Sequence, residues 1–296
     1  LETNNGDSNT GVGQAALYAN TTGGSNTAVG DRALAANTTA SNNTALGYYA
    51  LNANTASNLT AVGYYALKAN TTGTKNVALG YNALLTSTTA SNNTALGYDA
   101  LKLNTTGVEN VAVGSEALDA NTTGRENTSI GYVALGANTT GQYNTAVGRS
   151  ALGSNTTASQ MCAFGYEALA TSDTEAFNNA FGYQALKVAN GGRFNTAMGW
   201  KCMADLTTGD DNTGMGHDNM SNLTTGDDNT AIGNNSLYAL TTGNDNTAVG
   251  SYALDANTTG ASNVAMGYHA LGSNTTADDN TAVGRSALSA NTTGTN

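Results

Sequence analysis

Acidic residues recur at a fixed spacing in the second half of the sequence. Asp210 and Asp211 are followed 17 residues later by Asp227 and Asp228, and then by Asn244 and Asp245. If successive blocks of 17 residues stack as coils, these carboxylates form a column spaced about 4.8 Å apart. Carboxylates at that distance repel one another, and a hard cation such as Ca²⁺ would relieve the repulsion. The pattern predicts a calcium site of Asp210, Asp211, Asp227, Asp228 and Asp245. The alternative is a solvated acidic edge that resists edge-on association.

The other residues with reactive side chains do not suggest an active site. The two histidines, His217 and His269, lie 52 residues apart at positions where the residue type varies, which favours exposed surface residues over catalysis or metal binding. Cys162 and Cys202 would be separated by about 10 Å along a stack, beyond the roughly 7 Å reach of a disulfide. They are expected to be small, buried substitutes for Thr and Ala. No nucleotide-binding loop is present, so the sequence predicts a protein that is not an enzyme and that has no cofactor other than the proposed calcium.

Composition excludes several classes of protein. The 296 residues include 36 Gly and no Pro, and only 10% are charged, against roughly 25% in a typical soluble protein. The net charge of −11 disfavours nucleic acids and anionic membranes as partners. No apolar run approaches the roughly 20 residues of a membrane helix. Because the sequence begins at Leu1, it is expected to be part of a longer chain.

A repeat of 17 residues covers the whole chain. Its consensus is G-Y-x-A-L-x-A-N-T-T-G-x-x-N-T-A-V, with the first Gly counted as position 1, and it occurs in 17 copies from Gly13 to Gly284. Every step between these glycines is 17 residues except that from Gly47 to Gly63, which is 16. Such a period indicates a stacked repeat protein, and we expect residues 1–296 to form a single solenoid domain.

The length of the repeat favours β-structure. Seventeen residues are too few for two helices and a turn, but they accommodate two short strands, T-A-V-G-Y and A-L-x-A, with turns between them. The sequence therefore predicts an all-β fold, a parallel β-solenoid or β-roll of 17 coils. Asn at positions 8 and 14 should form side-chain amide ladders, and Gly at position 1 should occupy sharp corners. Pro is absent because nearly every backbone N–H is needed for hydrogen bonding between coils.

Pairs of apolar and small residues suggest a partner chain. Position 17 is always apolar and position 16 always Ala, Gly or Ser; position 5 is always Leu or Met and position 4 nearly always Ala. Neighbouring strand residues point to opposite faces, so both faces are expected to be buried, one inside the coil and one against a partner. Small residues at positions 16 and 4 would allow that partner to approach closely. The alternative is that positions 16 and 4 line a narrow coil corner and that a monomer suffices.

Two other repeated features have competing interpretations. Position 2 is often aromatic, at Tyr48, Tyr64, Tyr81, Tyr98, Tyr132, Tyr166, Tyr183, Trp200 and Tyr268. These rings could bind sugars, but stacking between coils is favoured. Asn-Thr-Thr sequons begin at Asn20, Asn37, Asn70, Asn104, Asn121, Asn138, Asn155, Asn257, Asn274 and Asn291. Because glycans on adjacent coils would crowd one another, an amide ladder is favoured over glycosylation of every copy.

The motifs N-T-A-V-G, N-T-A-L-G, N-V-A-L-G and N-T-S-I-G resemble the N-S-x-A-I-G repeats in the heads of YadA-type trimeric autotransporter adhesins. They are even more similar to the N-T-A-x-G-Y-x-A-L-x-x-N-T-T-G arrays of some bacterial and phage tail-fibre-like proteins. The adhesin resemblance implies a left-handed β-roll of three chains, an extracellular location on a cell or virion surface, and attachment to a surface through a glycan or host receptor. The repeat here is longer than is common in those heads.

The leading expectation is therefore a structural and adhesive extracellular fibre module that forms a homotrimer. One alternative is a subunit that assembles end to end into a filament. Another is an ice-binding solenoid, because Thr recurs at positions 9, 10 and 15. The adjacent Thr-Thr pair argues against ice binding, since neighbouring strand residues do not share a face.

Overall fold

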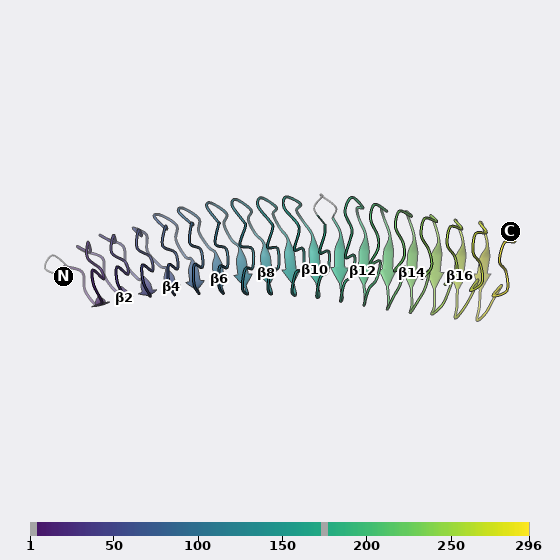
Figure 1. The fold of residues 1–296 in the computed structure, drawn as a ribbon, viewed down its shortest axis with the longest axis horizontal. Coiled ribbons are helices and arrows are strands. Elements are labelled where there is room, and N and C mark those ends of the chain that lie inside the picture. Colours follow the sequence, from purple (N-terminus) through teal and green to yellow (C-terminus); the bar gives the residue numbers. More distant parts are fainter. Residues whose placement is uncertain (1–4, 173–176, 296) are drawn as a thin grey trace. The chain divides into compact units, whose positions relative to one another are not determined.

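The computed structural model describes residues 5–172 and 177–295, and every regular element in these ranges is a three-residue β-strand (Figure 1). Each strand occupies positions 15 to 17 of one copy of the repeat. The all-β prediction is confirmed. The first nine strands are β1 (Thr10–Val12), β2 (Thr27–Val29), β3 (Thr44–Leu46), β4 (Thr60–Val62), β5 (Val77–Leu79), β6 (Thr94–Leu96), β7 (Val111–Val113), β8 (Thr128–Ile130) and β9 (Thr145–Val147). The others are β10 (Cys162–Phe164), β11 (Asn179–Phe181), β12 (Thr196–Met198), β13 (Thr213–Met215), β14 (Thr230–Ile232), β15 (Thr247–Val249), β16 (Val264–Met266) and β17 (Thr281–Val283).

By its internal contacts the chain divides into two compact units, an N-terminal unit of residues 1–146 and a C-terminal unit of residues 147–296. In the N-terminal unit β1 to β8 pair in chain order, all parallel, and in the C-terminal unit β10 to β17 do the same. Each Cα pairs with its equivalent in the next copy, and the short copy keeps this register because Thr44 pairs with Thr60. The fold is thus a parallel β-solenoid of about 16 turns, as predicted.

The segment A-L-x-A is not a strand, so the prediction of two strands per coil is wrong. Positions 3 and 5 have left-handed backbone conformations, as at Arg32 (φ 54°) and Leu34 (φ 50°). This conformation costs an L-residue roughly 1–2 kcal/mol. Leu34 is fully buried, which contributes about 1.5–3 kcal/mol, and its N–H donates to Ala50 O at 3.0 Å in the next coil. Burial and hydrogen bonding between coils therefore offset the strain.

Glycine at position 1 forms a corner that no other residue fits. Gly97 has φ 145°, and a Cβ there would lie 2.2 Å from the carbonyl oxygen of Gly114 in the next coil. The close approach of one coil to the next, as well as the positive φ, requires glycine. The predicted role of position 1 is confirmed.

Small side chains at positions 4 and 16 line the interior of each coil beside the leucine of position 5. Ala28, Ala33 and Leu34 are fully buried within the single chain. The prediction that positions 16 and 4 face a partner is wrong, because both positions line a narrow corner inside the coil. Gly214 shows how tight the interior is, because a Cβ there would lie 2.6 Å from Cys202 Sγ and 2.8 Å from Asn219 Oδ1. Beside Cys202 and Asn219, two of the larger side chains at position 4, position 16 is glycine.

Candidate functional site

The Asn residues of position 14 form the predicted amide ladder inside the solenoid. Asn110 is fully buried, its backbone N–H donates to Asn93 Oδ1 at 2.9 Å, and its side-chain amide donates to Gly124 O at 2.9 Å. Asn127 repeats the pattern on Asn110 at 3.0 Å. Each side chain therefore ties two successive coils together and satisfies buried backbone groups, as a buried polar group must.

The Asn residues of position 8 form a second ladder, and these are the sequon residues. Asn121 Nδ2 donates to Asn104 Oδ1 at 2.9 Å, and Asn138 Nδ2 donates to Asn121 Oδ1 at 3.0 Å. In the coil after Asn70, position 8 is Ser87 instead of Asn, and the Oδ1 of Asn70 is buried without a hydrogen-bond partner. The buried members of this set are Asn20, Asn37, Asn70, Asn104, Asn121, Asn138, Asn155, Asn257 and Asn274. Their burial favours the ladder role over glycosylation.

The acidic residues singled out from the sequence lie along one edge of the C-terminal unit. The carboxylate of Asp210 accepts a hydrogen bond from the backbone N–H of Arg193 at 2.7 Å, and that of Asp227 accepts one from the N–H of Asp210 at 2.8 Å. Ser41 and Ser91 accept the equivalent bonds in the N-terminal unit, each at 3.0 Å. The position-12 carboxylates thus have a structural role that a serine hydroxyl fills elsewhere.

Asp211, Asp228 and Asp245 occupy position 13, where the backbone is left-handed with φ 57° at each residue. Burial and the neighbouring carboxylates, first Asp211 and Asp245, raise the pKa of Asp228. In the described residues no group of three or more His, Cys, Asp or Glu side chains is arranged to hold a metal ion.

The calcium site stays a prediction. If the site exists, calcium should raise the melting temperature of the protein. The double substitution Asp227→Asn and Asp228→Asn should abolish that rise. An unchanged melting temperature on adding a chelator would remove the hypothesis.

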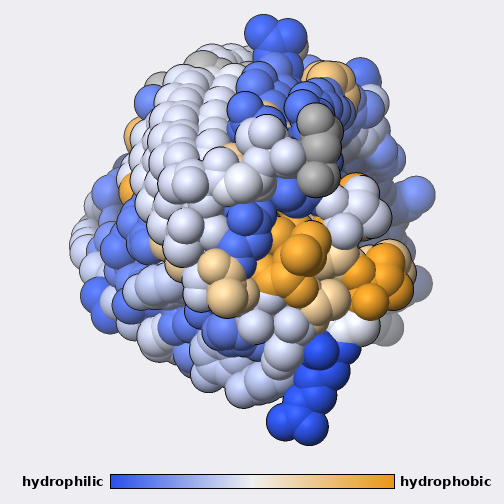
Figure 2. Space-filling model, turned by 90° about the vertical axis from the view of Figure 1, so that its right-hand side faces the viewer, coloured by the Kyte–Doolittle hydropathy of each residue, from blue (hydrophilic) through white to orange (hydrophobic). Residues whose placement is uncertain are grey.

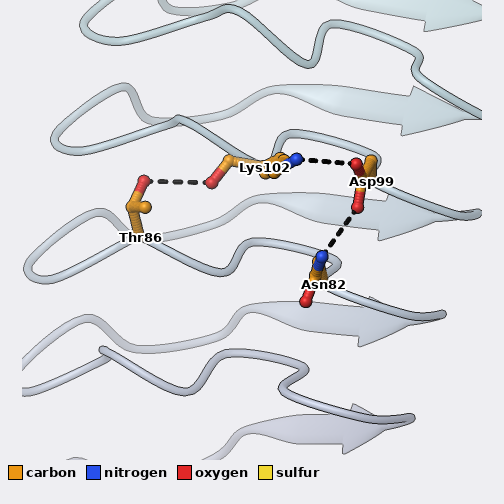
Figure 3. Close-up of polar contacts among 4 residues, drawn as sticks. All are labelled: Asn82, Thr86, Asp99 and Lys102. Carbon is orange, nitrogen blue, oxygen red and sulfur yellow. Dashed lines mark hydrogen bonds and ion pairs between the residues drawn. The ribbon is translucent and has the colours of Figure 1, made fainter.

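A polar cluster on the wall of the N-terminal unit joins adjacent coils (Figure 3). Asp99 accepts hydrogen bonds from Asn82 Nδ2 at 3.0 Å and from Lys102 Nζ at 2.8 Å, and Thr86 Oγ1 donates to the carbonyl oxygen of Lys102 at 3.0 Å. The bond to Asp99 raises the pKa of the Lys102 ammonium. Sequence reasoning missed this cluster because positions 3, 6 and 7 vary between copies.

A related cluster occurs in the C-terminal unit. Glu167 Oε2 accepts from Gln184 Nε2 at 2.9 Å and from Lys187 Nζ at 2.8 Å. The Lys187 ammonium, with Gln184, lowers the pKa of Glu167 to about 2. Both clusters consist of an acid at position 3, an amide at position 3 of an adjacent coil, and a lysine at position 6.

Many of the aromatic residues of position 2 stack between coils, as favoured from the sequence. Ring centroids in the N-terminal unit are 5.2 Å apart for Tyr48 and Tyr64 and 5.0 Å for Tyr64 and Tyr81, with nearly parallel planes. A hydrogen bond with Tyr65, followed by burial, raises the pKa of Tyr64 to about 12. Because each ring covers its neighbour's face, these ladders leave mainly ring edges for a ligand.

His217 and Cys202 are placed as expected, whereas His269 and Cys162 are both half-buried. His217 is exposed, stacks on Trp200 at 4.7 Å, and lies 3.3 Å from the carboxylate of Asp218. Neither Cys162 nor Cys202 is in a disulfide, and burial raises the pKa of the Cys202 thiol to about 12. A thiol with so high a pKa is a poor nucleophile at neutral pH.

The outward face of the strands carries two lines of side chains. We call the position-17 residues the outer apolar ladder: Val12, Val29, Leu46, Val62, Leu79, Leu96, Val113, Ile130, Val147, Phe164, Phe181, Met198, Met215, Ile232, Val249, Met266 and Val283. Leu96 is 40% exposed, and the rings of Phe164 and Phe181 stack at 4.9 Å. Position 15, most often Thr, shares this face. The sequence had indicated an apolar position 17, but not that it points outward.

Apolar side chains also gather at the end of the molecule shown in Figure 2, between hydrophilic areas. Val283, at the end of β17, is 68% exposed, and Leu288, in the following copy of the repeat, is 52% exposed. Val283 belongs to the outer apolar ladder, whereas Leu288 occupies position 5, which is fully buried in the earlier copies.

The sequence matches no protein-family model and no curated protein. In the described part of the chain, no helix has the length and apolar character needed to cross a membrane.

Proposed function

We propose that the chain is the repeat segment of an extracellular, adhesive fibre and that copies of it associate side by side through the outer apolar ladder. The proposal is supported by the apolar side chain that every copy of the repeat places at position 17. These side chains stay partly exposed in the single chain. Soluble proteins rarely leave a contiguous apolar strip of this kind uncovered.

A second copy of the chain is the partner that this face fits. The ladder repeats once per coil, so only a surface with the same repeat can match it coil after coil. Positions 15 and 17 carry no charged residue in any copy, although the chain has a net charge of −11. Like-charged copies can therefore meet at this face without bringing charges together. The number of copies, three, and the location outside the cell come from the resemblance to adhesin heads.

The test compares two exposed leucines of the N-terminal unit. Leu96 lies in the ladder and is 40% exposed, while Leu103 lies outside it and is 44% exposed. We expect the unmodified protein to have the mass of a trimer by light scattering, Leu96→Asp to reduce that mass to a monomer, and Leu103→Asp to leave it unchanged. Circular dichroism should show the same fold in all three.

A monomeric unmodified protein, or equal behaviour of the two variants, would contradict the proposal. Long fibres in electron micrographs would instead support end-to-end assembly.

Ice binding is a second candidate, favoured by one observation. Positions 15 and 17 share the outward face, so Thr213, Thr230 and Thr247 form a regular rank beside the apolar ladder. The sequence had shown that Thr recurs at position 15, but not that it shares its face with the apolar position 17. The position-9 hydroxyls are less available, because Thr224 Oγ1 donates to Thr241 O at 3.0 Å. Thermal hysteresis that Thr230→Tyr abolishes would support ice binding, and its absence in the purified protein would exclude it.

A further inference from the structure

A groove with a volume of about 340 Å³ opens on the wall of the C-terminal unit. It forms because position 6 carries small side chains in two successive coils, Ala204 and Ser221, between the longer Lys187 and Tyr238 at the same position. The volume is at the lower end of the roughly 300–1,000 Å³ typical of small-molecule sites. The groove is therefore large enough for a ligand of one or two rings.

The groove offers balanced charge and both kinds of hydrogen-bonding group. Two lysines, Lys187 and Lys201, and two aspartates, Asp205 and Asp218, line it, so that its formal charge is zero. Lys187 is already paired with Glu167. Together with neighbouring amide side chains these groups supply donors and acceptors in the same small space. This lining suits a neutral ligand with many hydroxyl groups better than an anion or a cation.

Two aromatic residues line the groove, and they differ in what covers their rings. Trp200 stacks on Tyr183 at 5.7 Å and on His217 at 4.7 Å, so both of its faces have neighbours. Tyr238 has Ser221 before it and Asp255 after it at the same position, and in the described residues no ring stacks on it. The Tyr238 ring is therefore available to pack against a ligand. An apolar ring surface with a polar hydroxyl suits the C–H face of a sugar.

We propose that this groove binds a pyranose, either as a free sugar or as one unit of a glycan chain. The inference names the ligand class of the adhesive module and rests on the proposed function for its biological role. The site itself lies in the C-terminal unit, and its lining includes no residue of the outer apolar ladder. Sugar binding and self-association can thus be measured separately.

Trp200 makes the test selective, because it is the only tryptophan of the chain and lines the groove. We would titrate the full chain with glucose, galactose, mannose, N-acetylglucosamine and their β-linked disaccharides and follow Trp fluorescence. At least one sugar should give a saturable change with an affinity of roughly millimolar strength, as for weak single-site binding. A disaccharide that binds more tightly than its monosaccharide would indicate a glycan chain, and equal affinities would indicate a free sugar.

The blocking variant is Ala204→Lys, since position 6 already accepts lysine at Lys68, Lys102 and Lys187. It should weaken sugar binding at least about tenfold. Ala35→Lys, the same substitution at position 6 of the N-terminal unit, should leave the affinity unchanged. Tyr238→Ala should also weaken binding, while Leu96→Asp, designed to prevent self-association, should bind sugar normally.

The proposal is overturned if no sugar in the panel gives a saturable change. Equal sugar affinities of the Ala204→Lys and Ala35→Lys variants would overturn it as well. So would an equal fluorescence change on adding the free amino acid glycine, a control solute that has no sugar ring. A monomeric unmodified protein that still binds sugar through this groove would refute the self-association proposal alone.

Discussion

Three coils of the C-terminal unit close the corner at position 8 with different chemistry from the N-terminal unit, while Asn155, Asn257 and Asn274 keep the amide in other coils of the C-terminal unit. At position 8 the N-terminal unit places Asn104, Asn121 and Asn138, which are linked by hydrogen bonds between coils. The C-terminal unit places leucines in the same position over three coils, Leu206, Leu223 and Leu240, all fully buried. The backbone is unchanged, since the N–H of Asn121 donates to Leu118 O at 3.3 Å and that of Leu223 to Met220 O at 3.1 Å.

The comparison shows that the corner requires a buried side chain of suitable size rather than one kind of interaction. An amide ladder satisfies polar groups that would otherwise be buried unpaired. A leucine stack excludes water and needs no directional bonds.

The largest effect is expected in the leucine corner. Leu223→Ala should lower the free energy of unfolding by about 2–5 kcal/mol, because it leaves a cavity between two other buried leucines. Denaturant unfolding followed by circular dichroism measures this loss. A loss below about 1 kcal/mol would mean that neighbouring side chains fill the cavity, and it would contradict tight packing of this corner.

In the amide corner the expected loss is smaller. Asn121→Ala removes the bonds to Asn104 Oδ1 and Gly124 O, and it removes one of the two acceptors of the Asn138 amide, which keeps its bond to Gly141 O. Leaving buried groups unpaired costs about 1–3 kcal/mol. Asn234→Ala, at an exposed asparagine, is the control and should have no measurable effect. Equal stabilities of the two variants would show that the ladder contributes nothing.

The wall clusters provide a weaker, pH-dependent comparison. The pKa of Glu167 is lowered from its ordinary 4.5 to about 2, so its ion pair stabilises the fold above pH 4.5 and the contribution disappears as the pH falls toward 2. Glu167 and Lys187 are partly exposed, which limits the gain to under ~1 kcal/mol. Glu167→Gln should therefore be slightly less stable than the unmodified protein at pH 7 and equal to it at pH 2. A difference that does not change with pH would contradict this assignment.

The smallest effect is expected at the acidic edge, and it has the opposite sign. The pKa of Asp228 is raised, so its ionised form destabilises the fold above that pKa, and the penalty is lost as the pH falls below the ordinary value of 3.8. Asp228→Asn should slightly raise the melting temperature at neutral pH and in low salt, but not at low pH. A lower melting temperature would show that the carboxylate makes a favourable contact.

Much of the fold follows from the sequence because a stacked repeat places each residue on its own equivalent. The 17-residue spacing predicted the coils, Gly97 and its equivalents predicted the corners, and Asn110 and Asn121 predicted the ladders. Polar cross-links such as Asp99 with Asn82 could not be predicted, since they depend on variable positions that become neighbours only when coils stack. The groove beside Ala204 escaped prediction for the same reason.

The sequence by itself determined the period, the strand at positions 15 to 17 and the identity of the residues that stack. Only the tertiary structure decided which side of each strand faces inward. Alternation separates position 16 from position 17, yet it is equally compatible with either one inside. The left-handed turns at positions 3 and 5 bring Leu34 and its equivalents into the interior, where they leave room at position 16 only for Ala, Gly or Ser, and the larger apolar residues of position 17 consequently face outward.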